Sequence, residues 1–220
     1  MKVTTDACLF GAYVANSLPQ GSNQPKRILD IGTGTGLLAL MLAQVTKQSY
    51  VDAIDMNEDS QAEAQENFKS SPWKSRFSSL HSPLQDFNPS TRYDLIICNP
   101  PFFGKSQKGI GKQKNQAIHS DHLSMEELST GIDRLLADNG DAWVMYPEWE
   151  MKAFVKWMQK TGLHPSDEVR VRNKSKAAVF RMIGRFSKVR TLLNESKVLI
   201  RKEDGTYSNN FQRLLEPYYL

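Results

Sequence analysis

The chain has 220 residues, of which 40% are hydrophobic and 24% charged, the proportions of a soluble globular protein with one large core. No apolar run approaches the roughly 20 residues of a membrane-spanning helix, and the amino terminus lacks the apolar region of a signal peptide. Two cysteines are too few for a disulfide framework or a complete zinc site, and the net charge of +4 matters only where basic residues cluster. We therefore expect one cytoplasmic domain that binds no metal, divided into an N-terminal helix and loop (1–25), a core (26–190) and a C-terminal strand and helix (191–220).

The first half of the chain predicts alternating strands and helices, which favours a parallel α/β sheet. Thr5 or Asp6 can cap a first helix that Pro19 ends. The elements expected next are strands at 27–31, 50–55 and 76–80, and helices from position 37 and at 59–70.

Glycines occupy every second position after the first strand, at Gly32, Gly34 and Gly36. Without Cβ atoms, this turn can approach a ligand closely and the next helix can begin hard against the strand. The second strand ends in Asp55, a carboxylate placed to accept hydrogen bonds from a ribose diol. A dinucleotide-binding dehydrogenase is the competing interpretation, but its third glycine would fall on Leu37.

A fourth strand is predicted at Leu95 to Cys98, because a continuous apolar run there is stopped abruptly by Pro100 and Pro101. Asn99 therefore lies at the carboxyl end of a buried strand, the edge at which open α/β sheets bind ligands. An amide, a rigid turn and the ring of Phe102 are offered together there, which predicts the active site.

The second half predicts a helix at 123–137 ended by Asn139 and Gly140, a strand at 142–146 and a helix at 151–160. Strands at 168–172 and 177–186 form a hairpin, and an extra strand near 197–201 precedes a short helix. Two segments, 103–116 and 169–194, are basic and contain no acid. A solvated surface is the simplest explanation of either segment, and a polyanionic partner is the functional one.

A family resemblance rests on these motifs. The spacing Asp30-x-Gly32-x-Gly34-x-Gly36, then Asp55, then Asn99 to Phe102, resembles motifs I, II and IV of class I S-adenosylmethionine-dependent amino-methyltransferases. More narrowly, segments 1–6, 37–44, 64–67, 71–73 and 204–208 resemble the bacterial valine-tRNA adenine N6-methyltransferases. The resemblance implies a Rossmann-like fold with a seven-stranded, mostly parallel sheet, an antiparallel C-terminal hairpin and helices on both faces.

It also implies an activity: transfer of a methyl group from S-adenosylmethionine to the exocyclic N6 amine of an adenine in tRNA, in the anticodon loop of a valine tRNA, by a monomer. Asn99 and Pro100 would accept the two amine hydrogens, and Phe102 would stack on the base. Cofactor-binding residues would be Thr5, Asp30, Gly32, Gly34, Gly36, Asp55, Met56, Ser82, Leu84 and Asn99. RNA phosphates would be contacted by Lys105, Lys108, Lys112, Lys114, Arg170, Arg172 and Lys174.

Three alternatives stay open on the residues alone. Glutamine N5-methylation of a release factor uses the same tetrad, but does not call for two basic segments. Guanine N2-methylation of ribosomal RNA fits those segments equally well, and the third alternative is an RNA-binding module that keeps a vestigial methyltransferase fold. Two departures from the family also stand out. Relatives begin some residues upstream with an aromatic-rich hairpin, and many carry an aspartate where this chain has Pro83, so Ser82, the Leu84 backbone or Asp86 would hold the cofactor's adenine.

Overall fold

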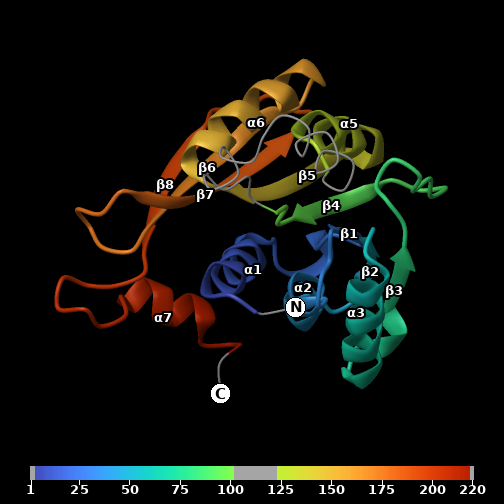
Figure 1. Cartoon of the computed structure of the whole chain (residues 1–220), viewed down its shortest axis with the longest axis horizontal. Coiled ribbons are helices and arrows are strands. Elements are labelled where there is room, and N and C mark those ends of the chain that lie inside the picture. Colours follow the sequence, from blue (N-terminus) through green and yellow to red (C-terminus); the bar gives the residue numbers. More distant parts are fainter. Residues whose placement is uncertain (1–2, 102–122, 219–220) are drawn as a thin grey trace, which may run out of the picture.

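An eight-stranded sheet organises the computed structural model, which describes residues 3–101 and 123–218 (Figure 1). The strand order is β3-β2-β1-β4-β5-β7-β6-β8, and among these described strands only β7 runs antiparallel to its neighbours. The strands are β1 Arg27–Ile31, β2 Tyr50–Asp55, β3 Phe77–His81, β4 Tyr93–Cys98, β5 Leu136–Tyr146, β6 His164–Arg172, β7 Val179–Ser187 and β8 Asn194–Leu199.

The expected mostly parallel sheet with an antiparallel C-terminal hairpin is confirmed. The sheet has eight strands and not seven, because the segment expected as a separate extra strand joins the sheet itself. There β8 pairs in parallel with β6, with Val171 opposite Val198. The hairpin of β6 and β7 is therefore enclosed between β5 and β8.

Helices cover both faces of the sheet (Figure 1). One face carries α1 Thr5–Ser17, α2 Leu37–Val45, α3 Glu58–Ser70 and α7 Asn209–Leu215, and the other carries α5 Met125–Leu135 and α6 Glu148–Lys160. Short 3-10 turns occur at η1 Gly21–Asn23 and η2 Lys74–Arg76. Along β4, Leu95 and Ile97 join the first core and Ile96 and Cys98 the second, as strand alternation requires.

The cap of the first helix differs from the expectation. Thr4, not Thr5 or Asp6, caps α1: its side-chain oxygen accepts from the Ala7 N–H at 3.4 Å. Asp6 instead pairs with Arg181 of β7, Oδ2 to Nε at 2.9 Å. Side-chain oxygens at three positions before a first helical turn are chemically equivalent caps, so sequence alone does not choose among them.

The pair Asn139 and Gly140, expected to end the helix at 123–137, lies inside β5 at a register shift against β4. A Cβ at position 140 would lie 2.8 Å from the Tyr93 carbonyl oxygen, so glycine serves here to let two backbones approach. Helix α5 consequently ends earlier than expected, at Leu135, and the strand begins at the next residue.

The chain order reverses at the centre of the sheet, where β1 lies between β2 and β4. Successive strands first step outward from β1 to β3, and β4 then returns to the other side of β1. In open α/β sheets a ligand binds outside the carboxyl ends of the strands at such a reversal. The fold therefore points to the segments that follow β1, β2 and β4.

Candidate active site

Strand pairing aligns three of the expected site residues across the carboxyl edge of the sheet. Ile31 of β1 pairs with Ile54 of β2 and with Cys98 of β4. The next residue on each strand is Asp55, Gly32 or Asn99, so these three residues follow one another across neighbouring strands. The residues that separate sequence motifs indicated therefore lie along one continuous edge of the sheet.

The glycine turn is held in place by its own backbone. The N–H groups of Gly32 and Thr33 both donate to the Ile54 carbonyl, at 2.9 and 3.0 Å. Gly32, Gly34 and Gly36 have φ values of 68°, 57° and 80°, a region in which side chains with a Cβ are strained.

The first and last of these glycines face different surroundings. A Cβ on Gly36 would lie 2.5 Å from the Phe68 ring of α3, so this glycine permits helix packing. A Cβ on Gly32 would meet nothing within 4 Å, so this part of the turn is open to a ligand.

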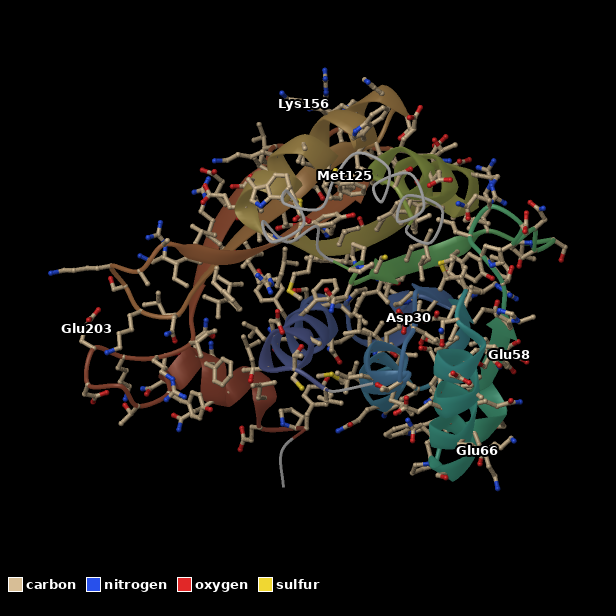
Figure 2. All side chains as sticks on the ribbon, viewed as in Figure 1. Asp30, Glu58, Glu66, Met125, Lys156 and Glu203 are labelled. Atoms are coloured by element: carbon tan, nitrogen blue, oxygen red, sulfur yellow. The ribbon has the colours of Figure 1, made fainter. Side chains whose placement is uncertain are left out.

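Asp30 is fully buried beneath the turn, in the interior of the molecule (Figure 2). Its Oδ2 accepts from the Thr33 hydroxyl at 2.7 Å, and its Oδ1 has no hydrogen-bond partner among the described residues. Burial raises the pKa of the Asp30 carboxyl to about 7, against the hydrogen bonds from Thr33 and Ala39, and the charge of Asp55 adds to the rise. A buried carboxylate oxygen without a partner fits a cationic ligand group.

Asp55, the last residue of β2, is hydrogen-bonded to the glycine turn. Its Oδ2 accepts from the Gly34 N–H and its Oδ1 from the Asn57 N–H, both at 2.9 Å. Each oxygen keeps a second lone pair, so the carboxylate is fixed in orientation and can still accept from a diol.

Asn99 carries the other unpaired buried atom of the site. Its side-chain oxygen has no hydrogen-bond partner among the described residues, although a buried amide oxygen is nearly always paired. Pro100 is buried and Pro101 is exposed. An acceptor held at the carboxyl end of β4 without a donor suits an incoming N–H group.

The segment after β3 lies beside the Asp55 end of β2. The Ser82 N–H donates to the Asp55 carbonyl at 2.9 Å, and the His81 Nε2 lies 3.0 Å from the Met56 carbonyl. The Met56 side chain is 47% exposed, and an exposed thioether next to a carboxylate is suited to an aromatic ring. The Ser82 hydroxyl donates a hydrogen bond to the Pro83 carbonyl at 3.0 Å. The Leu84 side chain is buried.

Arg134 of α5, which the sequence did not indicate, fastens this segment. Its guanidinium donates to the carbonyls of Leu84 and Phe87 and to the Asn88 side chain, at 2.8, 2.7 and 2.8 Å. No local pattern marks an arginine about fifty residues away from the loop it holds. Thr33, which bonds Asp30, was also missed, although it lies within the glycine motif.

The remaining expected site residues lie in different surroundings or outside the described part of the chain. Thr5 is exposed in the first turn of α1, and the neighbouring Asp6 joins this turn to β7 through its ion pair with Arg181. Arg170 lies between Glu168 and Glu195, at 2.6 and 2.7 Å. Arg172 donates to the Ala177 carbonyl at 2.8 Å, closing the hairpin of β6 and β7. Five expected residues lie outside the described part of the chain: Phe102, Lys105, Lys108, Lys112 and Lys114.

Comparison with known proteins gives a consistent family. Residues 12–144 match the family model of the methyltransferase small domain. A protein of Flavobacterium psychrophilum is 36% identical over all of this chain and 93% of its own length, and one of Bacteroides fragilis is 38% identical over all of this chain and 91% of its own. Both are named tRNA1(Val) (adenine(37)-N6)-methyltransferase.

A solved structure shows the same fold at low sequence identity. The N-methyltransferase NodS of Bradyrhizobium japonicum, in complex with S-adenosylhomocysteine, has a TM-score of 0.56 at 14% identity. The match covers 83% of this chain and 84% of NodS.

Proposed function

We infer the reaction of this protein from the premise that the chain belongs to the tRNA1(Val) (adenine(37)-N6)-methyltransferase family, a premise supported by similarity along its whole length. The protein is a methyltransferase that moves a methyl group from S-adenosylmethionine to the N6 amine of an adenine in tRNA. The anticodon loop of a valine tRNA is the proposed substrate.

The residues at the carboxyl edge fit S-adenosylmethionine. The unpaired Oδ1 of Asp30 and the open side of Gly32 suit the methionine end, with its ammonium group. Asp55 suits the ribose diol, and Met56, Ser82 and Leu84 lie where the adenine would follow. When bound, S-adenosylmethionine brings a methyl group made electrophilic by its sulfonium.

Thr5 and Gly34 are proposed to complete this binding site. Gly34 presents its backbone to Asp55, and Thr5 stands at the start of α1, at the same edge. Asn99 is proposed to contact the cofactor as well as the acceptor base.

The side-chain oxygen of Asn99, which has no hydrogen-bond partner among the described residues, is the observation that carries the proposal. The lone pair of an adenine amine is delocalised into the ring, so the free amine is a poor nucleophile. If Asn99 Oδ1 and the Pro100 carbonyl accept its two hydrogens, they favour the tetrahedral nitrogen that forms as the methyl group arrives. Pro100 and Pro101 restrict the backbone and so hold that carbonyl in place.

Phe102 is proposed to stack on the target base, which would offset the free energy of unstacking it from the RNA. No strong general base is required, because methylation makes the amine acidic and its proton can leave to water. The protein thus acts by alignment and by two fixed acceptors.

The setting is also part of the proposal. We propose that the protein works as a monomer in the cytoplasm, where its tRNA substrate is found. Within the described part of the chain, none of the helices has the length and apolarity to cross a membrane.

The product identifies the reaction. The protein is incubated with labelled S-adenosylmethionine and, separately, total tRNA, ribosomal RNA or release factor, and the digested products are identified. We expect label in N6-methyladenosine from tRNA. Label in N2-methylguanosine or in N5-methylglutamine would refute the adenine assignment and keep the cofactor site, and RNA binding without any transfer would favour the non-catalytic alternative.

A further inference from the structure

Two exposed aromatic side chains lie at the same edge of the sheet as the proposed site, and neither belongs to the cofactor or acceptor residues proposed above. Trp149 is 53% exposed and Phe180 is 44% exposed. Trp149 is the second residue of α6 and follows the carboxyl end of β5 closely, while Phe180 lies near the start of β7. Because β7 is antiparallel to β5, its start lies at the carboxyl end of β5.

Strand register shows how far Phe180 lies from Asn99. Cys98 pairs with Val144 on β5, and Tyr146 pairs with Met182 on β7. Asn99 is therefore level with Met145 of β5 and Ile183 of β7. It is separated from Phe180 by two strand spacings, roughly 10 Å, and by three residues along β7, again roughly 10 Å. Neighbouring nucleotides of one RNA strand can bridge such a distance.

Alternation places Phe180 on the sheet face that α6 covers. Met182 and Phe186 of β7 belong to the core beneath α6, and Phe180 follows the same alternation. On β6, Val169 and Val171 belong to the opposite core, so Arg170 and Arg172 also lie on the α6 side.

The electrostatic effect on Glu148 agrees with this placement. The Lys152 ammonium, bonded to Glu148 at 2.8 Å, lowers the pKa of that carboxylate, and Arg170 and Arg172 lower it further. The first turn of α6 and the end of β6 are thus electrostatic neighbours.

The charges around the two rings complement a polyanion. The Arg181 guanidinium lies 4.2 Å from the Phe180 ring centre, as in cation–π stacks, but its charge is already paired with Asp6. The hairpin that projects from this edge carries Arg172, Lys174 and Lys176, and none of these three is ion-paired with an acid of the described chain. Single exposed aromatics are common on protein surfaces. Two of them on one face, beside cations that lack acidic partners within residues 3–101 and 123–218 and within reach of a catalytic edge, form a surface suited to single-stranded RNA.

We propose that Trp149 and Phe180 form a stacking platform for the unpaired nucleotides that flank the target adenine in the tRNA loop. The proposal rests on the proposed function and extends it to substrate recognition. Stacking on both rings would hold the neighbouring bases while the target base turns toward Asn99, and the hairpin cations would follow the phosphates.

The test compares Trp149→Ala and Phe180→Ala with Tyr50→Ala as a matched control. Tyr50 is a 61% exposed aromatic at the start of β2, on the opposite edge of the sheet. Alanine at either platform position should raise KM for tRNA about 5- to 150-fold, the equivalent of one lost stacked base, without changing KM for S-adenosylmethionine. Tyr50→Ala should leave both constants unchanged, and Trp149→Phe should restore most of the loss.

Two further readouts separate stacking from other causes. The salt dependence of tRNA binding should keep its slope in both variants, because no phosphate contact is lost. A tRNA with an abasic nucleotide beside the target adenine should bind wild type more weakly, and Trp149→Ala or Phe180→Ala should then add little.

The proposal is overturned if both variants keep the wild-type KM for tRNA, or if Tyr50→Ala raises that KM as much as they do. It is also overturned if the wild-type protein sediments as a dimer that Trp149→Ala dissociates, since the rings would then bind a second copy of the chain. Failure of the proposed function would look different, because the wild type itself would then not methylate adenine.

Discussion

Asp30 should make both stability and cofactor binding depend on pH. Burial raises the pKa of its carboxyl from the ordinary value of 3.8 to about 7 in the folded protein. The folded protein therefore binds more protons than the unfolded chain between these values, so ionisation of Asp30 lowers the free energy of unfolding as pH rises from about 4 to 7. A ligand ammonium favours the ionised form, so binding should release a proton near neutral pH.

We predict that the Kd for S-adenosylhomocysteine decreases as pH rises from about 6 to about 8, as the carboxyl ionises. Calorimetry of wild type and Asp30→Asn across this range measures the effect. The variant should bind more weakly at pH 8 with little pH dependence, and without ligand it should lose less stability than wild type as pH rises. Parallel pH profiles for the two proteins would contradict this role of Asp30.

At the same scale, the sequence predicted the residue types of the site but not their pairing. Asp55 and Asn99 were indicated by their positions at strand ends, and Asp30 by its spacing from the glycines in the family motif. β-Sheet register then placed Asp55 and Asn99 on either side of Gly32. The missed residues Thr33 and Arg134 act through contacts that the strand pattern does not encode, since strand alternation says nothing about which side chain fastens a loop.

At the scale of elements, α5 determines the shape of the loop after β3 through Arg134. Its guanidinium makes three hydrogen bonds, of 2.7 to 2.8 Å, to residues 84–88. Gly131 of the same helix makes room for Leu84, because a Cβ there would lie 2.5 Å from the leucine side chain. The loop therefore depends on the helix at two points.

We predict that Arg134→Ala raises the KM for S-adenosylmethionine about tenfold, or about 1.4 kcal/mol, with little effect on the KM for tRNA, because the loop beside Met56 loses its anchor. Arg92→Ala is the control, since the ion pair that Arg92 makes within the described residues is with the exposed Asp138, at 3.1 Å. Steady-state kinetics with each substrate varied in turn measures both constants. Equal changes in the two KM values would indicate general destabilisation instead of loss of the loop anchor.

The hairpin of β6 and β7 was expected to be a uniform basic surface, and the structure divides it. Acids outside the segment 169–194 pair with several of its cations: Arg170 with Glu168 and Glu195, Arg181 with Asp6, Arg185 with Asp141 and Asp167, and Lys188 with Asp133 and Asp138. An acid-free run in sequence is therefore not acid-free in space.

We predict that Arg172→Ser and Lys174→Ser each lower the salt slope of tRNA affinity by about 0.7, the value for one lost phosphate contact on a single strand. Arg170→Ser should change the slope less, because that guanidinium already has two carboxylate partners. Binding titrations at several salt concentrations give the slopes. If Arg172→Ser and Lys174→Ser left the slope at the wild-type value, this hairpin would be solvated surface only.

At the scale of the whole molecule, the order of strands and helices followed from apolar runs and their spacing, and the central strands were recognisable because they are buried on both faces. The expectation failed where geometry depends on distant segments. The Asn139 and Gly140 turn became part of β5, and β8 completed the sheet, because both depend on a neighbouring backbone that the local sequence does not specify.

The whole fold also explains why one edge carries all the proposed chemistry. Reversal of strand order at β1 opens a site between the segments after β1, β2 and β4, and the antiparallel β7 brings Phe180 and the hairpin to the same edge. Cofactor, target base and RNA strand would then all bind at the carboxyl edge of the sheet. The central claim is that Asn99 promotes methyl transfer through its hydrogen bond to the acceptor amine, and that its contact with the cofactor contributes little to cofactor affinity.

The most direct measurement compares Asn99→Ala with wild type in two assays, calorimetric binding of S-adenosylhomocysteine and single-turnover methylation of tRNA. Loss of one fixed hydrogen-bonding group in the transition state should lower the methylation rate by about 10² to 10³, with the cofactor Kd nearly unchanged. Asn99→Asp, which keeps an acceptor oxygen, should retain part of the rate. A folded Asn99→Ala protein that methylates tRNA at the wild-type rate, or that loses cofactor affinity in proportion to its rate, would contradict the account.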